Sequence, residues 1–182
     1  MNWLKPILLL AAAFLAVFWE AAFGGLRNLL GAQVDLLPAL MVYAALATNL
    51  AAVCLLAWFG GLWFDALSFN PLGISVLPLF AVGLAIYSVR EVVLRQQTFA
   101  QFVLGLAASA AVPALTLGLL LTAGHPPLLG WGTIWQFIVM IAGGAAATPI
   151  VFILFESLER AFVHSRATPS SFRPDREIRR GR

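Results

Sequence analysis

The sequence predicts an all-α integral membrane protein with six transmembrane helices, and three observations support this. The 182 residues are 62% hydrophobic and only 10% charged, with a mean hydropathy of +0.93, whereas soluble domains average ~25% charged residues. Long apolar segments recur along the chain, separated by Gly, Pro, Asn and charged residues. Positive charges are also distributed unevenly between the loops, which indicates how many times the chain crosses the membrane.

Six apolar segments follow one another in the chain. They are Ile7–Phe23, Leu36–Thr48, Leu50–Phe64, Ile74–Val89, Phe99–Thr122 and Ile134–Leu158. A helix needs about 20 residues to cross the hydrocarbon core, and the first, fifth and sixth segments approach or exceed that length. The first segment follows Lys5 as a signal peptide would, but no compact A-x-A site leads into a soluble sequence. We therefore expect it to be retained as a membrane span.

The second and third segments admit two interpretations. Leu36–Phe64 carries one Thr-Asn break and no charge, so it is long for one span and short for two. With Lys5 inside, one span would place Arg90, Arg95 and the Arg-rich C-terminus outside, whereas two spans leave only Arg27 outside. The positive-inside rule therefore favours six spans with both termini cytoplasmic. The two short spans would require bilayer thinning or cover from neighbouring helices.

The tryptophans provide an independent check on this topology. Those expected near the outer interface, as in an aromatic belt, are Trp19, Trp63, Trp131 and Trp135. Trp3 would lie near the inner interface, and Trp58 does not fit the pattern.

The composition divides the chain into two parts. Residues 1–163 form the predicted six-helix transmembrane domain. Residues 164–182 are rich in Ser, Thr, Pro and Arg, with six arginines against two acids, and are predicted to be a disordered basic cytoplasmic tail. Such a tail suits an anionic inner leaflet or an acidic partner, or it serves only as a topology anchor.

Small residues and prolines mark expected packing sites within the long segments. Gly105…Ser109 and Gly143…Ala147 each place small residues at i, i+4, which allows close helix approach. Contact with another helix of the same chain is the simpler interpretation, and docking of a partner helix is the alternative. Pro113 and Pro149 lie inside spans and predict kinks.

The stretch Gly60–Gly73 predicts a hairpin between two membrane segments. Asn70-Pro71 starts a turn, Gly73 permits a left-handed backbone, and Asp65 places an acid at the end of the preceding apolar run. Interfacial acids are commonly helix caps, although they can also form a binding cluster. Both interpretations remain open for Asp65.

Two further acids, Glu20 and Asp35, are expected at the same outer interface. Asp35 precedes Leu36-Leu37-Pro38 and is suited to cap a helix whose first turn tolerates proline. Capping is the simpler interpretation for both acids, and a polar cluster that binds a ligand or partner is the alternative.

The sequence contains no recognisable catalytic or metal-binding motif. It lacks paired histidines at metal spacing, a Ser/His/Asp set and a phosphate-binding glycine loop. His125 lies in a Gly/Pro turn, and the single cysteine, Cys54, lies inside an apolar run, where packing is its expected role. We therefore expect a protein that is not an enzyme, with no catalytic residues, no metal, no cofactor and no nucleic-acid partner.

Three groups of residues together resemble a known pattern. They are Asp35-Leu36-Leu37-Pro38-Ala39-Leu40-Met41-Val42-Tyr43, then Gly60/Gly61…Asp65…Asn70-Pro71-Leu72-Gly73, then Arg90-Glu91…Arg95. Their order resembles the bacterial rod shape-determining protein MreD family over residues 1–160. The basic tail lies outside that resemblance.

The resemblance implies a non-enzymatic scaffold of the cell-wall elongation complex in the inner (cytoplasmic) membrane. Its implied partners, besides membrane lipid, are MreC and, through it, MreB, RodA and a class B penicillin-binding transpeptidase. The implied fold is similar to the S-component of energy-coupling-factor transporters, so a vitamin-binding transporter subunit is the alternative function. Few polar residues are expected on the outer face, which favours protein docking. The candidate partner-binding residues are Asp65, Asn70, Pro71, Gly73, Asp35 and Pro38.

Overall fold

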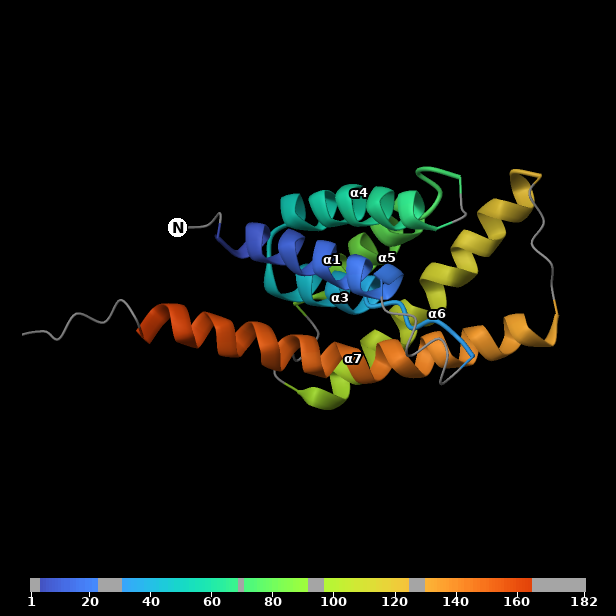
Figure 1. Cartoon of the computed structure of the whole chain (residues 1–182). Helices are drawn as coiled ribbons and strands as arrows, with labels where there is room; N and C mark the ends of the chain where they lie inside the picture. The colour runs from blue at the N-terminus through green and yellow to red at the C-terminus, as the bar shows by residue number, and fades with distance from the viewer. Residues whose placement is uncertain (1–3, 23–30, 69–70, 92–96, 125–129, 165–182) are drawn as a thin grey trace, which may run out of the picture.

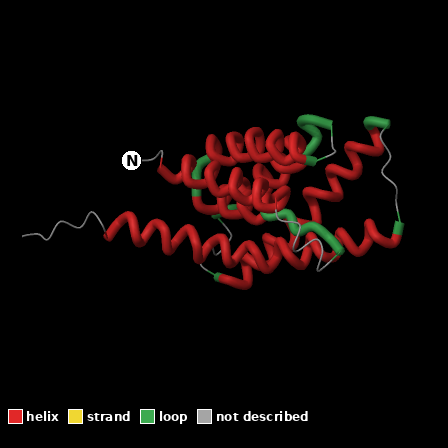
Figure 2. Tube along the Cα trace, in the orientation of Figure 1, coloured by secondary structure: helices red, strands yellow, loops and turns green. Residues whose placement is uncertain are grey.

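The computed structural model describes residues 4–22, 31–68, 71–91, 97–124 and 130–164, and within these ranges the regular structure is entirely α-helical (Figure 1, Figure 2). The helices are α1 (Leu4–Ala22), α3 (Leu37–Ala47), α4 (Leu50–Leu67), α5 (Val76–Val89), α6 (Thr98–Thr122) and α7 (Trp131–His164). The tail predicted for residues 164–182 lies outside the described residues beyond His164.

Four of these helices, α1, α4, α6 and α7, are long and apolar enough to cross a membrane. Many of their large apolar side chains point outward, including Leu15 at 62% exposure and Ile153 at 63%. Lipid solvates such side chains, so they need no cover from the rest of the chain. Length, composition and exposed surface are together those of a membrane protein.

The apolar run Leu36–Phe64 forms two helices, as the positive-inside argument requires. Helix α3 ends at Ala47 and α4 begins at Leu50. Asn49 is the N-cap of α4, and its side-chain oxygen accepts a hydrogen bond of 3.1 Å from the Ala52 N–H. An asparagine cap satisfies a backbone donor that a continuous helix would bond internally. One polar residue thus starts a new helix within the apolar run.

Helix α3 lies at the centre of the bundle and contacts all five other described helices. Every residue from Leu37 to Leu46 is buried. Its 11 residues span only about 17 Å at 1.5 Å per residue, far less than the hydrocarbon core. Close packing is possible because Gly83 of α5 lacks a side chain, and an added Cβ there would lie 2.5 Å from Met41 Sδ. The neighbouring helices therefore shield α3 from lipid.

Helices α6 and α7 cross through small residues, as predicted for Gly105…Ser109. Gly105 faces Thr148 and Ser109 faces Gly144 so closely that a Cβ on either glycine would overlap the facing side chain. On α7 the contact is therefore made by Gly144 and Thr148, whereas Gly143 packs against Val34. Beyond the crossing, the C-terminal half of α6 rises away from the start of α7 (Figure 1).

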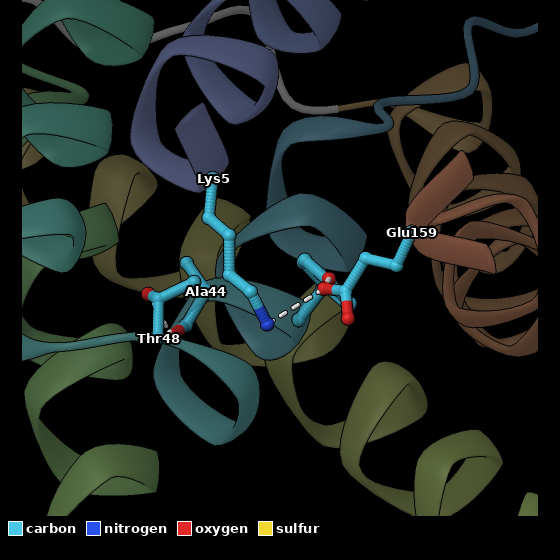
Figure 3. A network of polar contacts seen from close by, with 5 residues as sticks. Lys5, Ala44, Thr48 and Glu159 are labelled. Atoms are coloured by element: carbon cyan, nitrogen blue, oxygen red, sulfur yellow. Dashed lines mark hydrogen bonds and ion pairs between the residues drawn. The ribbon is translucent and has the colours of Figure 1, made fainter. Parts of the chain in front are cut away.

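The start of α1 and the end of α7 meet at one end of the bundle. Lys5 Nζ lies 2.8 Å from Glu159 Oε1 (Figure 3). The Tyr43 hydroxyl of α3 donates to the same oxygen at 3.2 Å. Arg90, at the end of α5, donates to the Thr48 carbonyl at 3.2 Å and lies over the Tyr87 ring. We call this the Lys5 end. Nearby on α7, Arg160 and Glu156 form an i, i+4 ion pair at 3.4 Å.

The opposite end contains the ends of α1 and α4 and the starts of α3 and α5. Hydrogen bonds described below connect these elements to one another and to the second turn of α7. We call it the hairpin end, after the turn between α4 and α5. The prolines predicted to interrupt helices, Pro113 and Pro149, lie inside α6 and α7.

Candidate functional site

Asp65 organises the turn between α4 and α5. It lies in the last turn of α4 and is only 1% exposed. Its Oδ2 accepts hydrogen bonds from the backbone N–H of Gly73 at 2.8 Å and of Ser75 at 3.1 Å, and its Oδ1 accepts one from the Ser75 hydroxyl at 2.5 Å. These donors precede the first turn of α5, so the carboxylate performs the role of an N-terminal cap from the preceding helix.

Two glycines allow the chain to reach Asp65. Gly73 has φ = +90°, in the left-handed region that favours glycine, as predicted for this turn. Gly61 lies against the start of α5, where an added Cβ would be 2.9 Å from the Val76 Cα. The backbones of α4 and α5 therefore meet without an intervening side chain.

The tip of this turn is exposed, although its supporting residues are buried. Leu72 is 74% exposed and Pro71 is also exposed, whereas Ser75 is only 3% exposed. Asn70, predicted to start the turn, lies outside the described residues. A rigid, internally bonded frame thus presents an apolar tip.

A second pair of acids occupies the corner between α1 and α3. Glu20, in the last turn of α1, accepts the Leu36 N–H on Oε1 at 2.8 Å. Asp35 accepts the Leu37 N–H on Oδ1 at 2.8 Å and is 5% exposed. The N-cap residue of α3 is Leu36, so Asp35 bonds to the first helical N–H from one residue before the predicted capping position, and Pro38 lies in the first turn as predicted. The buried start of a short helix needs such acceptors because water and lipid cannot supply them there.

One acceptor atom in this corner has no donor among the described residues. Glu20 Oε2 is buried with no hydrogen-bond partner in the described part of the chain. Within the described ranges, Asp35 makes one hydrogen bond, which its Oδ1 accepts from the Leu37 N–H. Burial raises the pKa of Asp35 to about 6, and the Leu37 N–H opposes that rise.

Gln136 connects this corner to α7. Its Oε1 accepts the Gln33 N–H at 3.0 Å, and its Nε2 donates to the Gln33 carbonyl at 2.8 Å. This two-way pair joins residues 103 positions apart in the sequence. It fixes the segment before α3 against the second turn of α7.

A cavity of about 310 Å³ lies between the two acid sites and the diverging halves of α6 and α7. Asp35 and Ser75 both contribute to its lining. Thr116 of α6 and Gln136 of α7 also contribute to its lining, which is otherwise mainly apolar. Asp35 and the Asp65-bound Ser75 therefore share one cavity, although they belong to different hairpins.

The expected candidate residues thus occupy different environments. Asp35, Pro38 and Asp65 are buried within the chain, whereas Pro71 is exposed and Gly73 is half-buried. The acids serve mainly as internal hydrogen-bond acceptors. Any direct contact with another protein would be made by the exposed tip of the turn.

Several interactions were not predicted from the sequence. The capping of Leu36 by Glu20 and the Gln33–Gln136 pair connect residues from different helices, and no local pattern indicates them. The Lys5–Glu159 pair joins α1 to α7, so no local pattern indicates it either. A sequence signal for Ser75 was available, since it follows Gly73 immediately before an apolar run, as a residue at a helix start often does.

In the described ranges, no group of three or more His, Cys, Asp or Glu residues could hold a metal ion. His125 and Arg27 lie outside those ranges. Cys54 is exposed on α4, in contrast to the buried packing role expected for it. Comparison of the chain with protein-family models, curated proteins and solved structures finds no match.

Proposed function

We propose that the chain spans the inner membrane six times, with both termini cytoplasmic. The described helices support this because α1, α3, α4 and α5 alternate in direction between the Lys5 end and the hairpin end. Lys5, Arg90 and Arg160 are the Lys and Arg residues of the described ranges, and all belong to helix termini at the Lys5 end. A cytoplasmic Lys5 end therefore agrees with the positive-inside rule.

The tryptophans support the same orientation. Trp19 ends α1, Trp63 ends α4, and Trp131 and Trp135 begin α7, so all four belong to the hairpin end. Each is at least 42% exposed. An exposed belt of this kind suits the outer interface of the membrane. Helices α3 and α5 would cross as short spans, with α3 covered by its neighbours.

The function we propose is that of a non-enzymatic scaffold in the cell-wall elongation complex. It would maintain rod cell shape by binding MreC, and through MreC it would connect MreB with the peptidoglycan synthases RodA and a class B penicillin-binding transpeptidase. The observation that carries the proposal is the Asp65 turn. The residues behind the MreD resemblance, Gly61, Asp65 and Gly73, form one rigid frame beneath an exposed tip.

In this proposal Asp65 positions the tip and does not itself contact the partner. Its oxygens already accept three hydrogen bonds within the chain. Pro71 and Leu72 provide the apolar contact, and burial of an exposed leucine contributes roughly 1.5–3 kcal/mol to binding. An apolar groove beside the turn, lined by Phe14, Gly60 and Trp63, offers room for the membrane helix of a bitopic partner.

Site-specific crosslinking tests the proposal. A photo-crosslinking residue at position 72 should capture MreC in cells, whereas the same residue at Ile153, which is exposed on α7, should not. Leu72→Asp should reduce co-purification of MreC and round the cells, with Ile153→Asp as the control for a charge placed on the surface. Unchanged MreC recovery with Leu72→Asp would reject the tip as the contact. Recovery of an ATPase module with a bound vitamin would instead favour the transporter-subunit alternative.

A further inference from the structure

The cavity at the hairpin end has the size of a small-molecule site. Its volume of about 310 Å³ lies at the lower limit of the roughly 300–1,000 Å³ of ligand pockets. It could hold about ten water molecules at ~30 Å³ each. Most of its lining is apolar, however, and such a surface does not hold that much water well.

Most of the polar groups around the cavity are already engaged within the chain. The Ser75 hydroxyl donates to Asp65, the Thr116 hydroxyl donates to the Val112 carbonyl, and both ends of the Gln136 amide bond to Gln33. These groups therefore offer little hydrogen-bonding capacity to an occupant. Apart from one group, the cavity wall therefore presents an apolar surface to an occupant.

The exception is the Asp35 carboxyl group. It is 95% buried and lines the cavity, yet the one hydrogen bond it makes within the described ranges is to the Leu37 N–H through Oδ1. The carboxyl group of Asp35 therefore lies at the wall of a space large enough for a ligand. A donor placed in that space would offset part of the cost of burying the carboxylate.

The charges at this end favour a cationic donor. Asp35 and Asp65 lie at the hairpin end, whereas the Lys and Arg residues of the described ranges belong to the Lys5 end. Phe64 and Phe137 also line the cavity. Aromatic rings attract ammonium groups as well as apolar surface, by roughly 0.5–2 kcal/mol.

We propose that this cavity binds a compact, largely apolar amine, whose ammonium group donates to Asp35 while its apolar body packs between α6 and α7. The site is separate from the exposed tip of the Asp65 turn, so the proposal does not rest on the scaffold function. Leu72→Asp should reduce MreC recovery without changing amine binding, which keeps the failure of one proposal distinguishable from the failure of the other.

The test uses the full chain in lipid nanodiscs and three probes of one shape. 2-Phenylethylamine carries a cationic donor, 2-phenylethanol a neutral donor, and ethylbenzene none. We expect saturable binding by calorimetry in the order amine, alcohol, hydrocarbon, after subtraction of partitioning into empty nanodiscs. Equal binding of ethylbenzene and the amine, or partitioning alone, would overturn the proposal.

Three variants locate the binding. Asp35→Asn should weaken amine binding at least tenfold, because the amide can keep the acceptor for Leu37 only by turning its NH₂ group to the cavity. Thr116→Phe should abolish binding of every probe by filling the cavity, and it provides the decisive result if Asp35→Asn does not fold. Glu156→Gln removes an exposed carboxylate at the Lys5 end and should change nothing.

Arg27→Gln tests whether a cation of the chain itself, and not an external amine, pairs with the Asp35 carboxylate. If the amine binds only after Arg27 is removed, the guanidinium occupies the Asp35 acceptor and the proposal is wrong. If Arg27→Gln leaves the affinity within twofold, Asp35 is available to an external amine, as proposed.

Discussion

The α1–α3 and α4–α5 hairpins, at the same end of the bundle, both use an acid to accept backbone N–H groups, but the two acids end in different environments. In both, an acid in the last turn of a longer helix accepts backbone N–H groups at the start of a shorter one. Asp65 is saturated by the donors of Gly73 and Ser75. Glu20 and Asp35 instead accept one described backbone N–H each, and Glu20 Oε2 has no partner among the described residues. The acceptors of the Asp65 turn are therefore all used, whereas this corner keeps one that the described residues do not fill.

The sharpest test of this difference exchanges each acid for its amide. In Asp65→Asn, the best orientation keeps the amide oxygen on the Gly73 and Ser75 N–H groups and turns the NH₂ group to the Ser75 hydroxyl, which must rotate to accept it. Three charge-assisted hydrogen bonds become neutral ones, so we expect a loss of about 3 kcal/mol in the free energy of unfolding. Glu20→Gln can keep its oxygen on Leu36 and put nitrogen at the unpartnered position, so the loss should be below about 1 kcal/mol. Unfolding in mixed micelles measures both. Equal losses would show that the two hairpins do not differ in this way.

The adjacent glycines test how tightly the Asp65 hairpin is packed. Gly61→Ala places a Cβ against the backbone of Val76, which cannot move aside independently, and should cost about 1–3 kcal/mol. Gly60→Ala meets the tip of the Leu37 side chain at 3.1 Å, which can rotate, so it should cost less. The same micelle assay compares the two variants. A larger effect at position 60 would contradict the packing described for this turn.

The pH dependence of probe binding tests only the corner between α1 and α3, where Asp35 lies. Because the pKa of Asp35 is raised to about 6, its carboxyl group is mostly ionised at pH 7 and mostly protonated at pH 5. A protonated carboxyl cannot attract an ammonium group, so 2-phenylethylamine affinity should fall roughly tenfold over those two pH units, about 1.4 kcal/mol. Glu20, the neighbouring acid from α1, is removed as a contributor by repeating the titration in Glu20→Gln. 2-Phenylethanol should show little change, and an equal fall for both probes would argue against Asp35 as the titrating group.

The smallest effect is expected at the Lys5 end, where the polar contacts are partly exposed. Lys5→Met removes an ion pair whose side chains are 48% and 36% exposed, so its loss should cost at most about 1 kcal/mol. Tyr43→Phe should have an effect of similar size, because its ring remains stacked on Phe155. If Lys5→Met or Tyr43→Phe destabilised the protein more than Asp65→Asn, the stronger polar contacts would lie at the Lys5 end and not at the hairpin end.

Local chemistry predicted much of this architecture. The Asn49 break, the Gly73 turn, the Asp35 cap and the small residues at Gly105 and Ser109 depend on neighbours in sequence or on the shape of one residue. The Glu20–Leu36 and Gln33–Gln136 bonds could not be predicted in the same way, because they depend on how helices pack. The cavity is also a product of packing, since it forms where α6 and α7 diverge beyond their crossing.

The position of the central helix has a consequence for biogenesis. Helix α3 has only 11 residues, and its surface contacts protein on all sides. Lipid alone could not satisfy its termini, which depend on Glu20 from α1 and Arg90 from α5. In the six-span arrangement proposed above, a nascent chain released into the bilayer after α3 would expose those termini, so we expect stable insertion to wait until α5 has been synthesised. The first four described helices would then enter the membrane as one unit.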